Sequence, residues 1–346
     1  LEISMTPKIT FEEHFMAPGF EKHSEAFLKL IPRDQAEILT RRLGDFDGER
    51  IEVMDRGGID RSIISLTGPG TQGESVEKAV DAAKGANDFL AEKISKNPNR
   101  LGGLATLPMH DPEAAARELY RAVKDLGLQG CLVNAPTNGA AYYEGTDYDP
   151  FWNELERLGV PFYLHPSNAY VTPHVLGGMP VLQGATWGWG VETGSHALRI
   201  LFGGVFDRFP DVKLVLGHMG EALPFLRWRY DSRFGAYPMG VSLDRAPSAY
   251  FGSNILITTS GVCSHPTLMG AIGEMGEDAV MFSVDYPYED TNLAVDFIET
   301  APLEDATRVK ICHDNAARLF GMPTLAVSYT HLRAHETPEH LVCRLL

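Results

Sequence analysis

Cysteine is scarce in this chain, with four residues in 346 and no CxxC pair. Cys131, Cys263, Cys312 and Cys343 are scattered along the sequence. Scattered, unpaired thiols are typical of a reducing compartment. No apolar run approaches the roughly 20 residues needed to span a bilayer. The N-terminus also lacks the basic-then-apolar layout of a signal peptide. We therefore expect a cytoplasmic protein that does not act in a membrane.

Positively charged residues are also few. The chain has 30 Lys and Arg against 46 Asp and Glu, which gives a formal net charge of -16. Such acidity argues against nucleic acid as a partner, since phosphate binding needs basic patches. An anionic substrate would gain nothing from the overall field, so its attraction must be local, for example to a bound cation. The hydrophobic share of 44% predicts an ordinary globular protein with an ample core.

Low-complexity segments, tandem repeats and dividing linkers are absent from the sequence as well. Short β-branched or apolar runs instead alternate with longer amphipathic runs. Helices are clearest at Ser75–Lys96 and Asp111–Leu126, and a third at Pro302–Leu319 closes the array. Eight alternating units favour a closed (β/α)₈ TIM-like barrel of the α/β class over an open sheet, which the pattern alone leaves open. The expected strands are Lys8–Phe11, Arg61–Ser65, Leu101–Thr106, Gly130–Val133, Phe162–His165, Lys213–Leu216, Ile255–Thr259 and Val280–Ser283.

The two ends differ from the rest of the pattern. We expect the natural chain to start at Met5, and residues 5–323 to form one barrel domain. Residues 1–4 and 324–346 are expected to be non-native or unstructured, because periodicity stops after Met322. We therefore do not expect the histidines of the tail to form a functional cluster, namely His331, His335 and His340.

Carboxylates and imidazoles follow four of the expected strands. Active-site groups of a barrel lie at the C-terminal ends of its strands, so these residues are expected to meet at one mouth. Glu12 and His14 are two apart and therefore point to the same face of a strand. Any one residue is a weak signal, but four strand ends together predict a mixed nitrogen and oxygen site for Zn²⁺, Mn²⁺ or Mg²⁺. The residues are Glu12 and His14, His165, His218 and Glu221, and Asp285.

These motifs resemble a known family, the amidohydrolase-related decarboxylases, which act on substrates such as γ-resorcylate, 2,3-dihydroxybenzoate and aminocarboxymuconate semialdehyde. The resemblance covers about Lys8 to Met322. The opening Glu-x-His is similar to the hydroxybenzoate branch, whereas the hydrolytic branch opens with His-x-His. The motifs are EEHF at Glu12, YLHP at His165, ETGSHALRIL at Glu192, LGHMGEALPF at His218, FSVDYPYED at Asp285 and NAARLFG at Asn315.

The resemblance implies a fold of the amidohydrolase superfamily and a reversible, non-oxidative decarboxylation of an ortho-hydroxylated aromatic acid such as a dihydroxybenzoate. One divalent ion is expected and no organic cofactor, because strand four lacks the Lys that bridges two metals in binuclear relatives. Asp285 would deliver a proton to the ring carbon, with His218 and Glu221 as a neighbouring acid/base pair. The implied metal ligands are Glu12, His14, His165 and Asp285.

The substrate contacts are less specific. We expect aromatic side chains near the mouth to hold the ring, although packing within loops accounts for them equally well. Arg229 is a further candidate for a carboxylate, although a surface ion pair is its ordinary role. The long segment Ser167–Glu192 is expected to serve function. The aromatic candidates are Phe15, Trp187, Trp189 and Tyr288.

Further predictions concern assembly, alternative functions and the other histidines. We expect a homodimer or homotetramer. The main alternative reaction is metal-dependent hydrolysis of a lactone or amide on the same fold, and a catalytically silent barrel is the second. The remaining histidines are expected in loop, surface, core or interface roles, namely His23, His110, His174, His196, His265 and His313.

Overall fold

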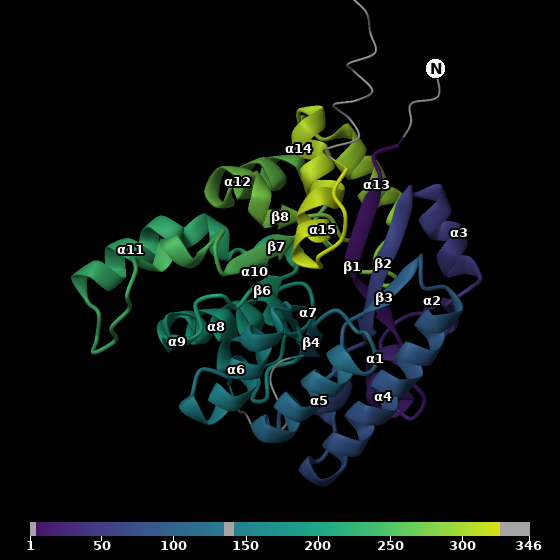
Figure 1. Ribbon diagram of the computed structural model, residues 1–346, viewed down its shortest axis with the longest axis horizontal. Coiled ribbons are helices and arrows are strands. Elements are labelled where there is room, and N and C mark those ends of the chain that lie inside the picture. The colour runs from purple at the N-terminus through teal and green to yellow at the C-terminus, as the bar shows by residue number, and fades with distance from the viewer. Residues whose placement is uncertain (1–4, 135–141, 326–346) are drawn as a thin grey trace, which may run out of the picture.

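The structure is a computed structural model and describes residues 5–134 and 142–325 (Figure 1). All eight expected strands are present within these ranges. The first is longer than predicted and continues through Glu12 and His14. The strands are β1 (Lys8–Phe15), β2 (Ile59–Leu66), β3 (Leu101–Gly103), β4 (Cys131–Asn134), β5 (Phe162–His165), β6 (Leu214–Leu216), β7 (Ile255–Thr258) and β8 (Val280–Met281).

The strands close into a ring. Parallel pairing links β1-β2-β3 in one sheet and β4-β5-β6-β7-β8 in another. A parallel bridge between Ala105 and Cys131 joins β3 to β4, and one between Glu13 and Tyr286 joins β1 to the segment after β8. Eight parallel strands that return to the first form a (β/α)₈ barrel, so the fold prediction is confirmed.

Helices surround the barrel, and α11 projects far from it (Figure 1). The predicted helix at Ser75–Lys96 is α4, and that at Asp111–Leu126 is α5, whose N-cap Asp111 accepts from the Ala114 amide. The α-helices are α1 (Glu21–Leu28), α2 (Arg33–Leu43), α3 (Glu49–Arg56), α4 (Val76–Lys96), α5 (Pro112–Lys124), α6 (Asp149–Leu158), α7 (Pro180–Gln183), α8 (Gly188–Phe202), α9 (Val205–Arg208), α10 (His218–Glu221), α11 (Arg227–Ala236), α12 (His265–Met275), α13 (Thr291–Thr300), α14 (Asp305–Val309) and α15 (Asn315–Leu319).

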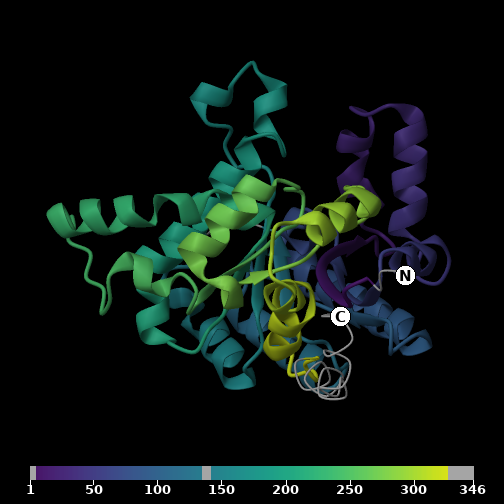
Figure 2. The ribbon, with the colours of Figure 1, turned by 90° about the horizontal axis from the view of Figure 1, so that it is seen from above.

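Several short helical turns connect these elements. The helix predicted over Pro302–Leu319 consists of α14 and α15 with one π-helical turn, η7, between them. Figure 2 shows that the segment around α7 and the α1–α2 pair project on the same side of the barrel. The 3₁₀ turns are η1 (Gly70–Gly73), η2 (Thr146–Tyr148), η3 (His174–Leu176), η4 (Leu223–Leu226), η5 (Pro247–Tyr250) and η6 (Glu277–Ala279), and η7 spans Lys310–Asp314.

Apolar side chains fill the end of the barrel opposite the mouth, which is the end at which the strands begin. One buried residue from most strands contributes to a central cluster, which α15 caps through Ala316 and Ala317. Phe320 packs edge-on against Phe11 with ring centroids 5.2 Å apart. Each fully buried large side chain contributes about 1.5–3 kcal/mol, so this plug is a stable floor beneath the mouth. The residues of the cluster that lie in a strand or directly after one are Ile9, Phe11, Ile63, Leu104, Leu132, Tyr163, Val215 and Met281.

A bulge in β1 separates this floor from the polar residues above it. Thr10 pairs with Ser62 and Glu13 with Ile64, so β1 uses one residue more than β2 over this stretch. Bulges redirect the side chains that follow them. As a result Phe11 packs in the floor while the adjacent Glu12 also reaches the barrel interior, where Tyr163 donates to its carboxylate.

Two sequence predictions concern residues beyond those that the structure describes. The tail histidines His331, His335 and His340 lie outside the described residues, as do residues 1–4. The single domain over residues 5–323 stays a prediction. Among the described residues, no helix is long and apolar enough to cross a membrane.

Candidate metal centre and active site

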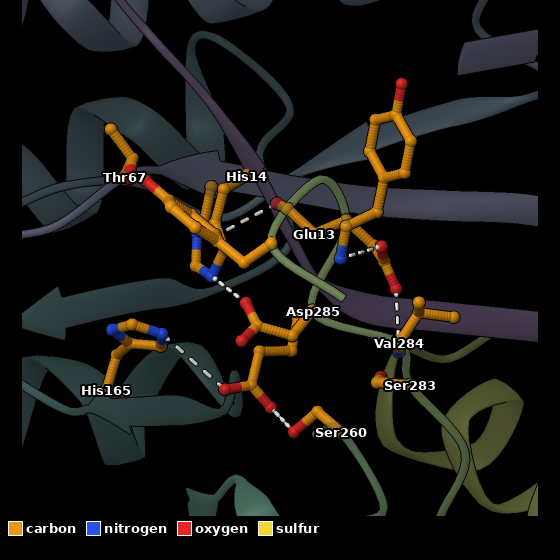
Figure 3. Close-up of polar contacts among 12 residues, drawn as sticks. Glu13, His14, Thr67, His165, Ser260, Ser283, Val284 and Asp285 are labelled. Carbon is orange, nitrogen blue, oxygen red and sulfur yellow. Dashed lines mark hydrogen bonds and ion pairs between the residues drawn. The ribbon is translucent and has the colours of Figure 1, made fainter. Parts of the chain in front are cut away.

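Four side chains converge above the apolar floor. Glu12 and His14 lie at the end of β1, His165 ends β5, and Asp285 follows β8. Each offers one ligand atom, and these four atoms lie within 4.8 Å of one another. Figure 3 shows His14, His165 and Asp285 facing a common centre. The structure therefore brings together the four residues that the resemblance implied as metal ligands.

The ligand atoms are short of partners. His14 Nε2 lies 3.0 Å from Asp285 Oδ1, and His165 Nε2 lies 3.6 Å from Glu12 Oε1. None of these four buried atoms has a hydrogen-bond partner among the residues that the structure describes. Buried polar atoms without partners destabilise a fold unless something satisfies them. Two imidazole nitrogens and two carboxylate oxygens fit a divalent cation such as Mn²⁺ or Zn²⁺.

Hydroxyl groups hold the other oxygen of Glu12. Oε2 accepts hydrogen bonds from the hydroxyls of Tyr163, Thr258 and Ser260, and the Thr258 distance is 2.9 Å. These donors leave Oε1 as the oxygen that faces the centre. Gly217 packs against the carboxylate, where an added Cβ would sit 2.5 Å from Oε1 and 2.6 Å from Oε2. The Glu12 carboxylate is therefore fixed in one orientation, as expected of a metal ligand.

The hydrogen bonds of His165 show which ring nitrogen carries its proton. Its Nδ1 lies 2.8 Å from Asn134 Oδ1 and 3.0 Å from the Pro166 carbonyl oxygen. A carbonyl oxygen only accepts, so Nδ1 carries the proton and Nε2 keeps its lone pair. Burial lowers the pKa of His165 well below its ordinary value, and the neighbouring His14 lowers it further. The neutral ring can therefore ligate a metal through Nε2.

His218 stands beside the four ligands. Its Nδ1 donates to Glu221 Oε1 at 2.8 Å, and its Nε2 lies 3.6 Å from Glu12 Oε1 and 3.7 Å from Asp285 Oδ2. The turn that carries it is unusual, because His218, Glu221 and Ala222 all have positive φ values between 50° and 63°. Non-glycine residues adopt this conformation rarely, and such strain clusters at functional sites.

Charge in the centre is balanced between His218 and the carboxylates. Burial on its own lowers the pKa of His218, but Glu12 and Glu221 outweigh burial and raise it well above its ordinary value. Burial on its own raises the pKa of Asp285, yet the nearby imidazoles of His14 and His218 hold it below its ordinary value. The group thus combines a proton donor, His218, with anionic oxygens that face a shared space.

Of the expected substrate contacts, Tyr288 lies nearest the centre. Its ring packs edge-on to His14 with centroids 5.7 Å apart, and its hydroxyl hydrogen-bonds with Thr67. The structure does not bring Phe15 to the mouth. Its ring lies in the core against Phe46 and Phe89, because the end of β1 turns that side chain toward the helices.

The other three substrate candidates lie on projecting segments. Trp187 is exposed at the start of α8, and Trp189 donates from its indole to Asn168 Oδ1 at 2.7 Å. Arg229 is exposed on α11, where it lines an apolar concavity with Tyr230 and Phe234. No contact of these three with the metal ligands occurs within the described part of the chain. Their part in substrate binding stays a prediction.

The remaining histidines have other surroundings. His23 bonds with Glu74 Oε1 at 2.9 Å, His265 with the Phe297 carbonyl oxygen at 2.9 Å, and His313 with Asp314 Oδ1 at 2.9 Å. Among described residues these histidines lie outside the cluster of possible metal ligands. The same holds for the exposed His174, the half-buried His110 and the buried His196.

Several supporting residues escaped the sequence analysis. Asn134 ends β4 and could have been found by its place at a strand end. Thr258 and Ser260, which donate to Glu12, could not have been found in this way, because Ser and Thr are common in and beside strands. Glu13 was hidden between the two ligands and faces away from them. The residues missed are Glu13, Asn134, Tyr163, Thr258 and Ser260.

Known proteins are similar to this chain in sequence and fold. The amidohydrolase family profile matches residues 12–322. γ-Resorcylate decarboxylase of Rhizobium sp. (strain MTP-10005) is 41% identical over 325 residues, 91% of this chain and 98% of that protein. A crystal structure of 2,6-dihydroxybenzoate decarboxylase with 2,6-dihydroxybenzoate superimposes with a TM-score of 0.87 at 41% identity, covering 92% of this chain and 100% of that one. A dihydroxybenzoic acid decarboxylase of Polaromonas sp. JS666, with manganese and 2-nitroresorcinol, gives 0.86 at 41% identity over 92% and 97%.

A (β/α)₈ barrel with two histidines and two carboxylates at its mouth defines a mononuclear metal-dependent enzyme. The chain belongs to the amidohydrolase family, and its similarity to decarboxylases over nearly its whole length makes it a carboxy-lyase. Manganese in the Polaromonas structure and the four converging ligand atoms agree on a divalent metal as the cofactor.

Proposed function

We propose that this protein decarboxylates 2,6-dihydroxybenzoate or a closely similar ortho-hydroxybenzoate, without an oxidant and reversibly. The observation that carries the proposal is the set of four buried, partnerless ligand atoms with His218 beside them. Support also comes from the similar proteins, which are a γ-resorcylate decarboxylase and structures that hold 2,6-dihydroxybenzoate or 2-nitroresorcinol.

The arrangement suits protonation of a ring carbon. Direct loss of CO₂ from an aryl carboxylate would leave negative charge on the ring, whereas an ortho hydroxyl allows the carboxylate-bearing carbon to be protonated first. A bound divalent ion supplies a Lewis acid and a template for the phenolate and carboxylate oxygens. Asp285 takes a proton from His218 and gives it to the carbon, a C–H bond forms, the bond to the carboxyl group breaks, and CO₂ leaves as the ring regains aromaticity.

His218 lies where it can exchange the transferred proton with Asp285. Its Nε2 lies 3.7 Å from Asp285 Oδ2, and Glu221 holds the opposite nitrogen. A ring held at one nitrogen presents the other in a constant direction, which favours hydrogen bonding to the substrate hydroxyl and exchange of a proton with Asp285.

A panel of hydroxybenzoates followed by ultraviolet absorbance with manganese-loaded protein tests the proposal. In heavy water the product should carry one deuterium at the carbon that held the carboxylate. High bicarbonate should drive carboxylation of the corresponding phenol, because no oxidant or ATP enters the reaction. Protein that leaves every hydroxybenzoate unchanged but opens lactones or amides would instead be a hydrolase.

Asp285→Asn separates binding from chemistry. The amide keeps the size of the side chain and one oxygen toward the metal, but it cannot give a proton as an acid. We expect the variant to bind 2,6-dihydroxybenzoate, measured by calorimetry, and to release CO₂ at least about 10²-fold more slowly. Decarboxylation at the wild-type rate would remove Asp285 as the proton donor.

We further propose a homodimer or homotetramer in the cytoplasm. Trp228 and Met239, on and just after the projecting α11, are 78% and 87% exposed. Exposed apolar patches of this kind mark sites of association. Light scattering that returns the mass of one chain would contradict the assembly.

The cysteines of the described ranges are free thiols, which suits a reducing compartment such as the cytoplasm.

A further inference from the structure

Glu13 is a buried carboxylate that faces away from the metal ligands. It lies between Glu12 and His14 on β1 and is 2% exposed. Its Oε1 accepts the backbone N–H of Val284 at 3.1 Å, and its Oε2 accepts that of Tyr286 at 3.0 Å. Figure 3 shows this carboxylate bonded to the chain on both sides of Asp285.

The backbone of Asp285 needs such support. Its φ of 76° lies in the left-handed region, which a non-glycine residue keeps only when its surroundings hold it there. The Asp285 amide donates to the Glu12 carbonyl oxygen at 2.9 Å, and the His14 amide donates to the Tyr286 carbonyl oxygen at 2.6 Å. The three successive amides of residues 284–286 are therefore all held by β1, two of them by the Glu13 side chain.

We propose that Glu13 is a positioning residue, which fixes the backbone of Asp285 so that its carboxylate meets the metal ion and the substrate in one geometry. The part that concerns chemistry rests on the proposed function, whereas the part that concerns the metal does not. Arg50 supports the same junction, because its Nη2 donates to the His14 carbonyl oxygen at 2.6 Å and its guanidinium lies 4.8 Å from the Tyr286 ring centroid.

Only a carboxylate with a side chain of this length can accept hydrogen bonds from both the Val284 and the Tyr286 amides. Both oxygens accept an N–H, so neither can be replaced by a donor. In Glu13→Gln, one backbone amide would face an NH₂ group at the same distance. In Glu13→Asp, the side chain is one methylene shorter and can reach one amide but not both. Loss of either bond frees the chain beside Asp285.

The experiment compares Glu13→Gln with Glu118→Gln. Glu118 is also 2% exposed and bonds to Asn87 and Arg121 on helices away from the metal ligands. Both variants lose a buried carboxylate, and both should unfold at a lower temperature than the wild type. We expect only Glu13→Gln to bind Mn²⁺ about 10- to 100-fold more weakly, measured by competition with a fluorescent chelator.

Two further readouts address position directly. The electron paramagnetic resonance spectrum of bound Mn²⁺ should change in Glu13→Gln and not in Glu118→Gln. Hydrogen exchange of the Val284 and Tyr286 amides should be faster only in the first variant. With 2,6-dihydroxybenzoate at saturating Mn²⁺, kcat should fall more than KM rises, because a misplaced Asp285 impairs proton transfer more than binding.

Wild-type manganese affinity, spectrum and kcat in Glu13→Gln, together with a fall in stability like that of Glu118→Gln, would overturn the proposal. If Glu13→Gln does not fold, Glu13→Asp is measured in the same way and should show the same pattern with smaller changes. If affinity and spectrum change while the wild type leaves every hydroxybenzoate intact, the positioning role stands and the proposed function fails.

Discussion

His165 shows how one side chain depends on a chain of contacts. Asn134 and the Pro166 carbonyl oxygen fix the proton on Nδ1, and burial keeps the ring neutral. The lone pair on Nε2 is then directed at Glu12 and the shared centre. These neighbours leave the imidazole able to bind a metal ion, which the residue type alone would not ensure.

We predict that His165→Ala loses metal and activity together. No other nearby neutral nitrogen can take its place, so metal content should fall and decarboxylation should drop by at least about 10²-fold. Metal analysis of the purified variant and an absorbance assay measure both. His110→Ala serves as the control, because His110 lies outside the ligand cluster, and should keep both. Full metal content in His165→Ala would exclude it as a ligand.

At the scale of elements, the turn from β6 into α10 leaves no room beside Glu12. Gly217 directly follows β6, and a Cβ there would lie 2.5 and 2.6 Å from the two oxygens of the carboxylate. Since three hydroxyls hold that carboxylate, it cannot move aside without losing hydrogen bonds. The glycine is needed for space and not for its backbone conformation, because its φ of -73° suits any residue.

We therefore predict that Gly217→Ala lowers manganese affinity and kcat by roughly tenfold or more, through displacement of Glu12. Gly273→Ala on α12 is the matched control. Its Cβ would meet nothing within 4 Å, and alanine stabilises an exposed helix position by about 1 kcal/mol. Titration with Mn²⁺ and thermal unfolding of both variants check this. Equal manganese affinity in the two would refute the steric argument.

Helix α8 carries a second element-scale feature, the buried His196. Its Nε2 accepts the Tyr143 amide at 3.1 Å, and its ring contacts the Tyr142 ring. Burial lowers its pKa to about 3, and Arg199 contributes to the shift. As the pH falls, His196 therefore binds a proton near pH 6.5 in the unfolded chain but only near pH 3 in the folded chain.

Stability should consequently fall as the pH drops below 6.5. From this residue alone we predict a loss of about 1.4 kcal/mol per pH unit between roughly pH 6.5 and 3. His196→Gln keeps an acceptor for Tyr143 but does not titrate, so its stability should fall less steeply with acid. Urea unfolding of both proteins at pH 7.5 and 5.5 measures the difference. Parallel pH profiles would show that His196 does not contribute.

For the whole molecule, the metal centre joins distant parts of the barrel. The four candidate ligands come from β1, from β5 and from the segment after β8, so an ion that they bind would connect the first, middle and last strands. Binding to the folded state alone stabilises that state by mass action. Without the ion, the two carboxylates and two imidazoles leave polar atoms unsatisfied inside the protein.

Removal of metal by a chelator should therefore lower the unfolding temperature. An ion present at 100 times its Kd contributes about 2.7 kcal/mol, which corresponds to roughly 5 °C for a chain of this size. Added Mn²⁺ should restore the value, followed by calorimetry. His165→Ala should unfold at the same temperature with and without Mn²⁺. A wild type indifferent to chelator would show that the centre holds no tightly bound ion.

The order of the strands and the candidate site residues could be predicted from local sequence patterns. All eight expected strands are present, because alternation of apolar runs and helical periods is a local property. Glu12 and His14 share a face because they are two residues apart on one strand. His165 and Asp285 could be identified because they stand at or just after strand ends, where barrels keep their active sites.

The atoms that face the common centre, and the contacts that hold them there, could not be predicted without the fold. Tyr163 bonds to Glu12 across 151 residues, and Val284 bonds to Glu13 across 271. Such pairs arise from barrel closure, which no local pattern encodes. The bulge in β1 shifts the facing of side chains by one residue, and Phe15 packs in the core instead of the mouth. Residue type and strand-end position thus indicated the candidate site, and the family resemblance implied which residues would bind the metal. The contacts of those residues depend on closure of the ring, because closure brings distant segments together.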